Sequence, residues 1–384
     1  MTASPRTAPV IAFRADASRR IGSGHVMRCL TLADALTAQG ATCHFLCRPH
    51  DGHLIERISA HGHQVHRLPP AEEDHDEVAS AVAGEDAPEH ADWLGVEWPV
   101  DAEQSRHILA TLRPDWLVVD HYALDARWET IVTPEGCRVL VIDDLADRAH
   151  RADLLLDQNL GRWASDYAGL VPEVCRVLVG PAHALLRPEF ADWRDTSLAR
   201  RQHPRLRHLL ITLGGVDADN VTRQVLDSLS RCALPDDMRI SVVMGATAPW
   251  LDDVRAQARR MPWPTEVVVN VDDMARRMAE ADLAIGAAGS TSWERCCLGV
   301  PTLTVVLADN QEGVAQALAD VGVARHLGDA EAFAETLPFE LAACQEPATL
   351  ASLSQAASRL TDGLGTGELV RHLISLPMEE RHDA

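Results

Sequence analysis

A histidine follows directly on a glycine-rich loop near the N-terminus. The run from Phe13 to Arg28 reads FRADASRRIGSGHVMR. Gly22 and Gly24 permit a tight turn, and a helix that begins at His25 offers free N–H groups and the positive end of its dipole to an anion. The same dipole favours the uncharged imidazole that a general base requires. His25 is therefore a candidate general base, and the structural alternative is a helix-capping or packed histidine.

Two further glycine-rich turns lie in the second half of the chain. One reads LGGVDADN from Leu213 to Asn220, and the other reads IGAAGSTSWER from Ile285 to Arg295. Each follows an apolar strand-like run and precedes a helical pattern, which suits a phosphate group at a helix N-terminus. Glu294, one turn inside its helix, is a candidate acceptor for ribose hydroxyls. The alternative is a pair of ordinary turns with an exposed acid.

Carboxylates follow two other apolar runs, at Asp120 and at Asp143-Asp144. Acids that leave buried strands point toward the ligand-binding edge of a sheet, where they could orient His25 or bind sugar hydroxyls. Capping of the next helix is an equally reasonable interpretation. A group of histidines at 53, 61, 63 and 66 is interpreted as a solvated loop, because no cysteine or carboxylate stands at a recognisable ligand spacing from them. No metal site and no cofactor are predicted.

The composition excludes several classes of function. All 35 basic residues are arginine, so a pyridoxal Schiff base, a Walker A lysine and a lysine nucleophile are excluded. A net charge of −22 disfavours nucleic acid and anionic membranes as partners. The nine cysteines form no Cys-x-x-Cys pair and are expected to be buried thiols. No apolar run reaches the roughly 20 residues of a membrane span, and no signal peptide is recognised, so we expect a cytoplasmic protein.

The elements that position these residues alternate between apolar runs and helical patterns. Strands are expected at 10–13, 43–47, 116–119, 139–142, 154–156 and 177–179, and again at 209–213, 240–244, 266–269, 283–285 and 302–306. Continuous apolar runs of this kind are typical of parallel sheets buried on both faces. We predict an α/β fold with two Rossmann-like lobes, at 1–190 and 205–375, and a cleft between them. The charged stretch 187–207 is interpreted as the linker, and the acidic stretch 70–89 receives no function.

Taken in order, these motifs resemble a known family. The matching segments are RAD at 14–16, IGSGHVMR at 21–28, DHY at 120–122, IDD at 142–144, DQN at 157–159, GP at 180–181, ALLRPEF at 184–190, GGVDADN at 214–220, GSTSWE at 289–294 and DNQ at 309–311. The family is the UDP-2,4-diacetamido-2,4,6-trideoxy-β-L-altropyranose hydrolases of pseudaminic acid synthesis. These enzymes are similar in fold to GT-B glycosyltransferases. The resemblance implies release of UDP by water attack at the anomeric carbon, without a metal or cofactor.

The resemblance also implies roles for individual residues. It makes His25 the base and implies that Tyr122 and Asn310 shape the sugar site, the three forming the catalytic set. Substrate contacts are expected from Arg14, Asp16, Gly22, Ser23, Gly24, Arg28, Asp120 and Gln311. Nucleotide contacts are expected from Gly214, Gly215, Asp217, Asn220, Gly289, Ser290 and Glu294.

Two other functions remain open from the sequence. A GT-B glycosyltransferase would use the same UDP-sugar with a sugar or lipid acceptor in place of water. The N-terminal half shows no basic amphipathic or apolar patch suited to a membrane-bound acceptor, which disfavours this alternative. A non-catalytic nucleotide-sugar-binding protein is the third possibility, and the intact His25 loop argues against it. The identity of the acetamido sugar and the oligomeric state are not predicted.

Overall fold

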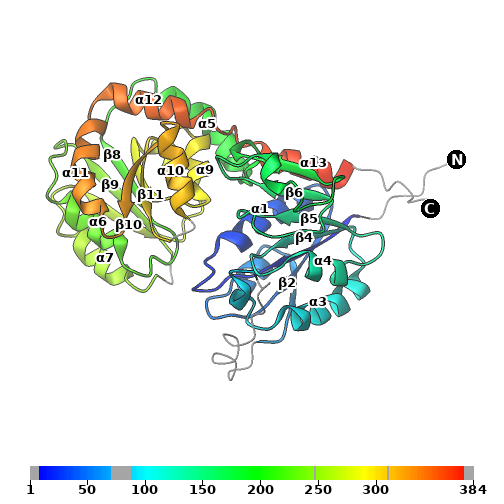
Figure 1. Ribbon diagram of the computed structural model, residues 1–384. Coiled ribbons are helices and arrows are strands. Elements are labelled where there is room, and N and C mark those ends of the chain that lie inside the picture. Colours follow the sequence, from blue (N-terminus) through cyan, green and yellow to red (C-terminus); the bar gives the residue numbers. More distant parts are fainter. Residues whose placement is uncertain (1–7, 71–87, 246–247, 309–310, 376–384) are drawn as a thin grey trace. The chain divides into compact units, whose positions relative to one another are not determined.

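The chain divides into two compact units in a computed structural model that describes residues 8–70, 88–245, 248–308 and 311–375. The first unit comprises the described parts of Met1–Gln158, together with Arg162–Leu185 and the chain from Thr366 onward. The second comprises Asn159–Gly161 and the described parts of Leu186–Gly365. Each unit is built on its own parallel sheet, as predicted from the apolar runs (Figure 1).

The first unit has a seven-stranded sheet in the order β3-β2-β1-β4-β5-β6-β7. The strands are β1 (Val10–Ala15), β2 (Thr42–Cys47), β3 (Gln64–Arg67), β4 (Trp116–Asp120), β5 (Arg138–Ile142), β6 (Leu154–Asp157) and β7 (Arg176–Val179). The helices include α1 (Gly24–Ala38), α2 (Ile55–Ala60), α3 (Trp98–Leu112) and α4 (Ala126–Val132), with 3-10 turns η2 (Ala91–Leu94), η3 (Ala164–Tyr167) and η4 (Pro181–His183). Only β3 was not predicted, because this edge strand reads QVHR and has no apolar run.

Both faces of this sheet are covered, which explains why its central strands are apolar at consecutive positions and do not alternate with polar residues. Ile11 and Phe13 of β1 pack in one core cluster with residues of α1, whereas Ala12 packs in another with residues of α3 and α4. Because successive side chains of a strand point to opposite faces, a strand covered on both sides has no polar alternation.

The last described helix, α13 (Gly365–Ser375), belongs to the first unit and not to the second, where the range 205–375 had placed it. Its Leu369, Val370 and Leu373 are buried in the cluster that contains α1. The indole N–H of Trp116 in β4 donates to the carbonyl of Leu373 over 3.0 Å. The helix, red in Figure 1, thus closes one face of the first sheet, a contact between residues that lie far apart in the sequence.

The second unit has a six-stranded parallel sheet in the order β10-β9-β8-β11-β12-β13. Its strands are β8 (His208–Thr212), β9 (Arg239–Met244), β10 (Thr265–Val269), β11 (Leu283–Ala287), β12 (Thr302–Val306) and the unpredicted edge strand β13 (Ala324–Asp329). Its helices are α5 (Pro188–Arg200), α6 (Val221–Leu229), α7 (Leu251–Ala258), α8 (Met274–Glu280), α9 (Thr291–Cys297), α10 (Glu312–Asp320), α11 (Phe333–Cys344) and α12 (Pro347–Ala357).

The interpretation of 187–207 as a linker was wrong for most of its length, because Pro188–Arg200 forms α5. Proline at the first helical position is compatible with a helix start, since its missing N–H is not needed there. Phe190 and Ser197 are buried, and Arg194 on the same face donates to the carbonyls of Cys297, Ser358 and Thr361. The proline marks the start of a helix, and part of the charge in this stretch attaches that helix to the unit.

Within each unit, the strand order places the predicted motifs at one edge of the sheet. In each sheet the order reverses beside the first strand, between β1 and β4 in one and between β8 and β11 in the other. Ligands of such sheets bind outside the carboxyl ends of the strands at this reversal. The His25 loop follows β1 and Asp120 ends β4, whereas the two glycine-rich turns of the second unit follow β8 and β11.

A buried ion network anchors the carboxyl end of β1. Arg14 donates to Asp101 of α3 from Nε over 3.2 Å and from Nη2 over 2.8 Å, and its Nη1 lies 2.7 Å from Asp16. Arg48 also donates to Asp101, over 2.7 Å, and all four side chains have no exposed surface. Burial alone would raise the pKa of Asp101, but the charges of Arg14 and Arg48 hold it below its ordinary value.

We expect Asp101→Ala to destabilise the first unit by about 3–5 kcal/mol, because it leaves two buried guanidinium groups without their shared carboxylate. Chemical denaturation measures the loss. Glu103→Ala on the same helix is the control, since Glu103 forms its ion pair with Arg106 at the surface and its removal should change stability little. Equal effects of the two substitutions would contradict the role given to the network.

Candidate active site

His25 is held by a buried carboxylate. It lies in the first turn of α1, and its Nδ1 is 2.6 Å from Oδ1 of Asp120 at the end of β4. Burial alone would raise the pKa of Asp120, but the charges of Arg28 and His25 lower it strongly, so the group is a carboxylate that can only accept. Nδ1 therefore donates its proton to Asp120, and Nε2 is the ring nitrogen left for another partner. Within the described ranges no side chain or backbone group bonds to that Nε2.

Arg28 joins this pair to a second carboxylate. Its Nε and Nη2 donate to the two oxygens of Asp120 over 2.6 and 2.7 Å, and its Nη1 donates to Asp144 over 3.0 Å. Asp144 in turn accepts from the hydroxyl of Tyr122 over 2.7 Å. Burial and the charge of Asp144 raise the pKa of Tyr122 well above its usual range, so the phenol stays protonated. Four of the expected site residues (His25, Arg28, Asp120 and Tyr122) thus form one connected cluster.

The start of α1 beside this cluster is open. Ser23 and Gly24 are exposed, and Ser23 makes no side-chain hydrogen bond that caps the helix. A Cβ built on Gly22 or Gly24 would meet no atom within 4 Å. The first N–H groups of α1 therefore remain available to a ligand, which agrees with the anion site that the loop predicts.

Arg14 and Asp16 were expected to contact substrate, but the structure gives them another place. Both side chains are fully buried in the network of β1 and α3. Asp16 accepts from the backbone N–H of Arg48 over 2.7 Å. Their position supports the loop from within, and they do not join the His25 cluster. The match at RAD therefore marks a structural support in this chain.

In the second unit, the turn after β8 exposes the glycines and uses the acid internally. Gly214 has a φ of +97°, and both Gly214 and Gly215 are exposed. Asp217 accepts from the N–H groups of Val221 and Thr222 over 2.8 and 2.9 Å. It therefore satisfies the first turn of α6, the place at which a phosphate was expected. Asn220 precedes that helix with a φ of +54°, and its side-chain oxygen is buried without a hydrogen bond in the described structure.

The turn after β11 has no side-chain cap, although the N–H groups of Ser292 and Trp293 donate to the carbonyls of Gly289 and Ser290. Ser290 precedes α9 and makes no capping hydrogen bond, and Gly289 next to it is half-buried. Glu294 has 18% of its side chain exposed and lies 3.9 Å from Arg187. Burial raises the pKa of Glu294 to about 7, although Arg187 and Arg295 act in the opposite direction. The expected ribose acceptor is thus an acid that changes charge near neutrality.

Two expected residues follow β12 in the sequence. Asn310 lies outside the described residues, so its predicted role stays a prediction. Gln311 accepts from the backbone N–H of Leu307 through its side-chain oxygen over 3.1 Å. This bond occupies the carbonyl of the amide.

Sequence reasoning missed a buried arginine beneath the turn after β11. Arg295 donates from Nη2 to the carbonyl of Ala287 over 2.7 Å and from Nη1 to the hydroxyl of Thr291 over 3.0 Å. Burial lowers its pKa to about 10, which still leaves it charged at neutral pH. Gly286 makes room for it, since a Cβ there would lie 2.4 Å from Nη1 of Arg295. Gly286 and Arg295 in one motif were the available signal for this buried arginine, but hydrophobic periodicity alone does not reveal it.

Three aromatic or basic neighbours of Tyr122 were also missed. His90 and Trp93 have ring centroids 5.5 and 5.7 Å from that of Tyr122, and the guanidinium of Arg148 lies 5.9 Å from it. They come from η2 and from the loop after β5, far from the glycine loop in sequence. No local pattern marks them, because their meeting depends on how the strands are ordered.

The interpretation of the histidine group as a solvated loop was wrong. His63 and His61 lie 2.7 and 2.9 Å from the two oxygens of Asp34 on α1, and His66 of β3 stacks with His44 of β2. The carboxylate partner comes from 27 residues upstream of His61, which is why the local sequence did not show it. Among the described residues, no group of three or more His, Cys, Asp and Glu side chains could hold a metal ion.

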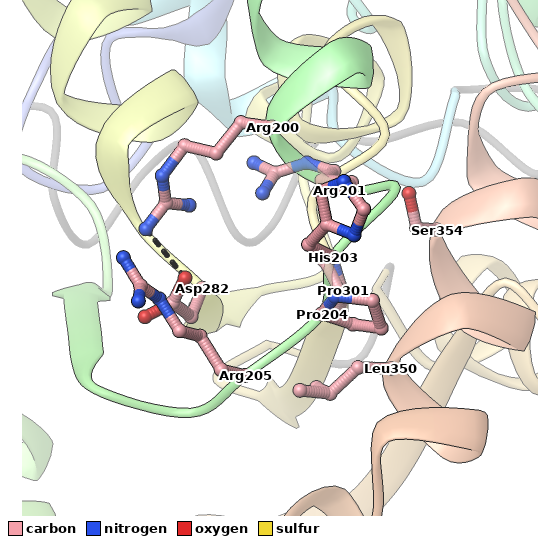
Figure 2. Close-up of a pocket in the computed structure, with 9 residues that line it drawn as sticks. All are labelled: Arg200, Arg201, His203, Pro204, Arg205, Asp282, Pro301, Leu350 and Ser354. Atoms are coloured by element: carbon pink, nitrogen blue, oxygen red, sulfur yellow. Dashed lines mark hydrogen bonds and ion pairs between the residues drawn. The ribbon is translucent and has the colours of Figure 1, made fainter.

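A small basic cavity in the second unit contains none of the predicted site residues. Figure 2 shows Arg200, Arg201, His203 and Arg205 around it, with Asp282 paired to Arg200. Arg201 donates to the carbonyls of Met278, Ala281 and Leu298. These arginines connect α5 with the end of α8 and the start of β11, so we assign them to the packing of α5 on the unit.

Most of the cysteines are buried thiols, as expected from the sequence. All nine cysteines are free thiols, of which Cys175 and Cys232 are half-buried and the others buried. Within the described part of the chain, none of the helices combines the length and the apolar character needed to span a bilayer.

Comparison with known sequences bears out the resemblance. Residues 208–364 match the family model of the glycosyltransferase family 28 C-terminal domain. The UDP-2,4-diacetamido-2,4,6-trideoxy-beta-L-altropyranose hydrolase of Campylobacter jejuni is 27% identical over 313 residues, which cover 81% of this chain and 97% of that protein. The UDP-N-acetylglucosamine–N-acetylmuramyl-(pentapeptide) pyrophosphoryl-undecaprenol N-acetylglucosamine transferase of Chromohalobacter salexigens is 27% identical over 344 residues, or 87% and 89% of the two chains.

Comparison with solved structures confirms the fold class. MurG from Acinetobacter baumannii superimposes with a TM-score of 0.68 at 17% identity, covering 96% of this chain and all of that one. The chain therefore has a GT-B-like fold with two Rossmann-like units, and the two sequence relatives described above are a UDP-sugar hydrolase and a UDP-N-acetylglucosamine transferase.

The raised pKa of Glu294 makes the stability of the protein depend on pH. Because the folded state holds this proton more tightly than the unfolded state, Glu294 favours folding at low pH, and this contribution is lost as pH rises toward about 7. Glu294→Gln removes this titration. The free energy of unfolding of the wild type minus that of the variant should therefore fall between about pH 4.5 and about pH 7, and level off above pH 7. Urea denaturation at several pH values measures the difference, with the exposed Glu331→Gln as control. A difference in unfolding free energy that does not change with pH would contradict the raised pKa of Glu294.

Proposed function

We propose that this chain hydrolyses a UDP-activated acetamido-deoxy sugar, with His25 as the general base. The observation that carries the proposal is the His25–Asp120 pair, in which a buried carboxylate holds Nδ1 and leaves Nε2 without a bond from the described residues, beside an open helix start. A non-catalytic binding protein has no need of a base held in this way. The similarity to the Campylobacter jejuni hydrolase over 97% of that protein supports both the reaction and the sugar class.

In the proposed reaction, Nε2 of His25 accepts a proton from water as the water oxygen bonds to the anomeric carbon of the sugar. The bond from that carbon to the phosphate oxygen breaks, and its electron pair leaves with UDP. Asp120 stabilises the imidazolium through Nδ1, and Arg28 keeps Asp120 ionised and fixed in place. A base oriented by a carboxylate is a general arrangement for activating a poor nucleophile.

The second unit is proposed to bind the nucleotide. UDP is a good leaving group once its charge is met, and this lysine-free chain can meet it with backbone N–H groups and arginine. The uncapped Ser290 turn with Arg295 beneath it and the exposed Gly214-Gly215 turn are the candidate donors. The match to the family 28 C-terminal domain covers both turns. Asp217 is proposed to shape the first turn, since it already caps α6.

Glycosyl transfer is the second candidate, and the transferase relative that covers 87% of this chain favours it. The two reactions share the donor and the base and differ only in whether water or an acceptor hydroxyl attacks. Release of free sugar in the absence of any acceptor therefore separates them.

For the nucleotide half of the proposal, we expect Glu294→Ala, which removes the acceptor, to weaken UDP binding. Loss of a hydrogen bond between ribose and the carboxylate corresponds to about 1.5–3 kcal/mol, or roughly 10- to 150-fold in Kd. Calorimetry with UDP at pH 8, where Glu294 is mostly ionised, measures the change. An unchanged Kd would remove Glu294 from the nucleotide site.

For the catalytic half, we expect His25→Asn to keep UDP-sugar binding and lose roughly 10²–10⁴-fold in kcat. Release of UDP from a UDP-diacetamido-trideoxy sugar is the assay, and the exposed His107→Asn in the same unit is the matched control. Hydrolysis in ¹⁸O-labelled water adds a second readout, since attack at carbon labels the sugar and attack at phosphorus labels UDP. Wild-type rates in the variant, or label in UDP, would overturn the proposal.

A further inference from the structure

We infer that the rings of His90, Trp93 and Tyr122, called the aromatic layer below, bind the apolar substituents of the sugar and select deoxy acetamido sugars. The inference rests on the proposed function, because it assigns the sugar-recognition surface beside the proposed base. No motif singled out His90 or Trp93, and neither lies in the segments that carry the resemblance.

The three rings pack as a continuous group. The centroids of His90 and Trp93 are 4.4 Å apart, and those of Trp93 and Tyr122 are 5.7 Å apart with the ring planes 26° from parallel. Tyr122 in turn meets His25 edge to face, with centroids 4.6 Å apart. The layer therefore begins at the proposed base and extends away from it.

The layer can receive a ligand. His90 and Trp93 are half-buried, so part of each ring faces solvent, whereas a packed core ring would be enclosed. An ion pair between Asp92 and Arg20 joins the segment that carries the layer to the glycine loop. In that loop, a Cβ on Gly22 or Gly24 would meet no atom within 4 Å, so the chain that leads into His25 borders open space. A sugar whose anomeric carbon lies near Nε2 of His25 is thus within reach of these rings.

The chemistry of the layer favours apolar groups. Tyr122 is buried and its hydroxyl is committed to Asp144, so the ring surface that a ligand can meet is that of His90 and Trp93. The carboxylate of Asp92 beside the layer is paired with Arg20. The faces of aromatic rings bind C–H surfaces and methyl groups well, but a hydroxymethyl group placed against a ring face would lose its hydrogen bonds to water. A methyl at C6 and the methyl of an acetamido group are the substituents that fit.

The test compares two substrates that differ by one oxygen, a UDP-2,4-diacetamido-2,4,6-trideoxyhexose and its 6-hydroxy counterpart. We expect the wild type to prefer the deoxy sugar in kcat/KM, and Trp93→Ala to reduce that preference by about tenfold or more, the usual effect of one apolar contact. His90→Ala should act in the same direction. Trp93→Phe, which keeps a ring, should restore most of the preference.

Trp163→Ala is the matched control, because Trp163 lies in the same unit with 72% of its surface exposed. The Kd ratio of the two sugars, measured on a His25→Asn background, repeats the comparison without turnover and excludes a purely catalytic effect. Unchanged preference in Trp93→Ala, with hydrolysis still dependent on His25, would overturn the aromatic layer alone. Absence of any His25-dependent hydrolysis in the wild type would instead overturn the proposed function.

Discussion

The carboxylate of Asp120 is the group on which the first unit's site depends. It is fully buried at the end of a central strand, and a buried carboxylate is costly unless its oxygens are paired. Arg28 and His25 supply those partners from successive turns of α1. The same bonds that compensate its burial set the tautomer of His25. Stability and proposed catalysis therefore share one interaction.

This arrangement needs a rigid frame, and the doubly wound sheet provides it. β1 and β4 are neighbours at the reversal of strand order, so the helix that follows β1 begins beside the residue that ends β4. The network of Arg14, Arg48 and Asp101 ties β1, β2 and α3 together behind that edge. Arg14 and Asp16 are thus best understood as supports of the loop that carries His25.

The absence of lysine shapes the electrostatics of both units. Arginine stays charged even when it is buried, and its planar donors can satisfy several oxygens at once. Arg28 joins two carboxylates in the first unit, while Arg295 lies beneath a glycine-rich turn on carbonyl and hydroxyl oxygens. In a chain with a net charge of −22, such local positive groups are what an anionic nucleotide would encounter. The overall charge therefore says little about the ligand.

The sequence by itself determined the fold class, because strands buried on both faces must be apolar throughout and glycine-rich turns must follow them. It also made His25 a candidate from its glycine-rich loop and Asp120 from its place at a strand end, whereas Tyr122 was expected only from the resemblance to a known family. It missed β3 and β13, whose edge positions require no apolar run. It also did not predict α5, because arginines such as Arg194, whose partners are carbonyls distant in sequence, resemble the charge of a loop. Only the tertiary structure decided the partners. These partners are distant in sequence: Asp144 bonds to Tyr122, Trp93 stacks on Tyr122, Asp34 contacts two histidines, and α13 packs on the first sheet. Such pairings follow from strand order and helix packing, and local patterns carry no information about them.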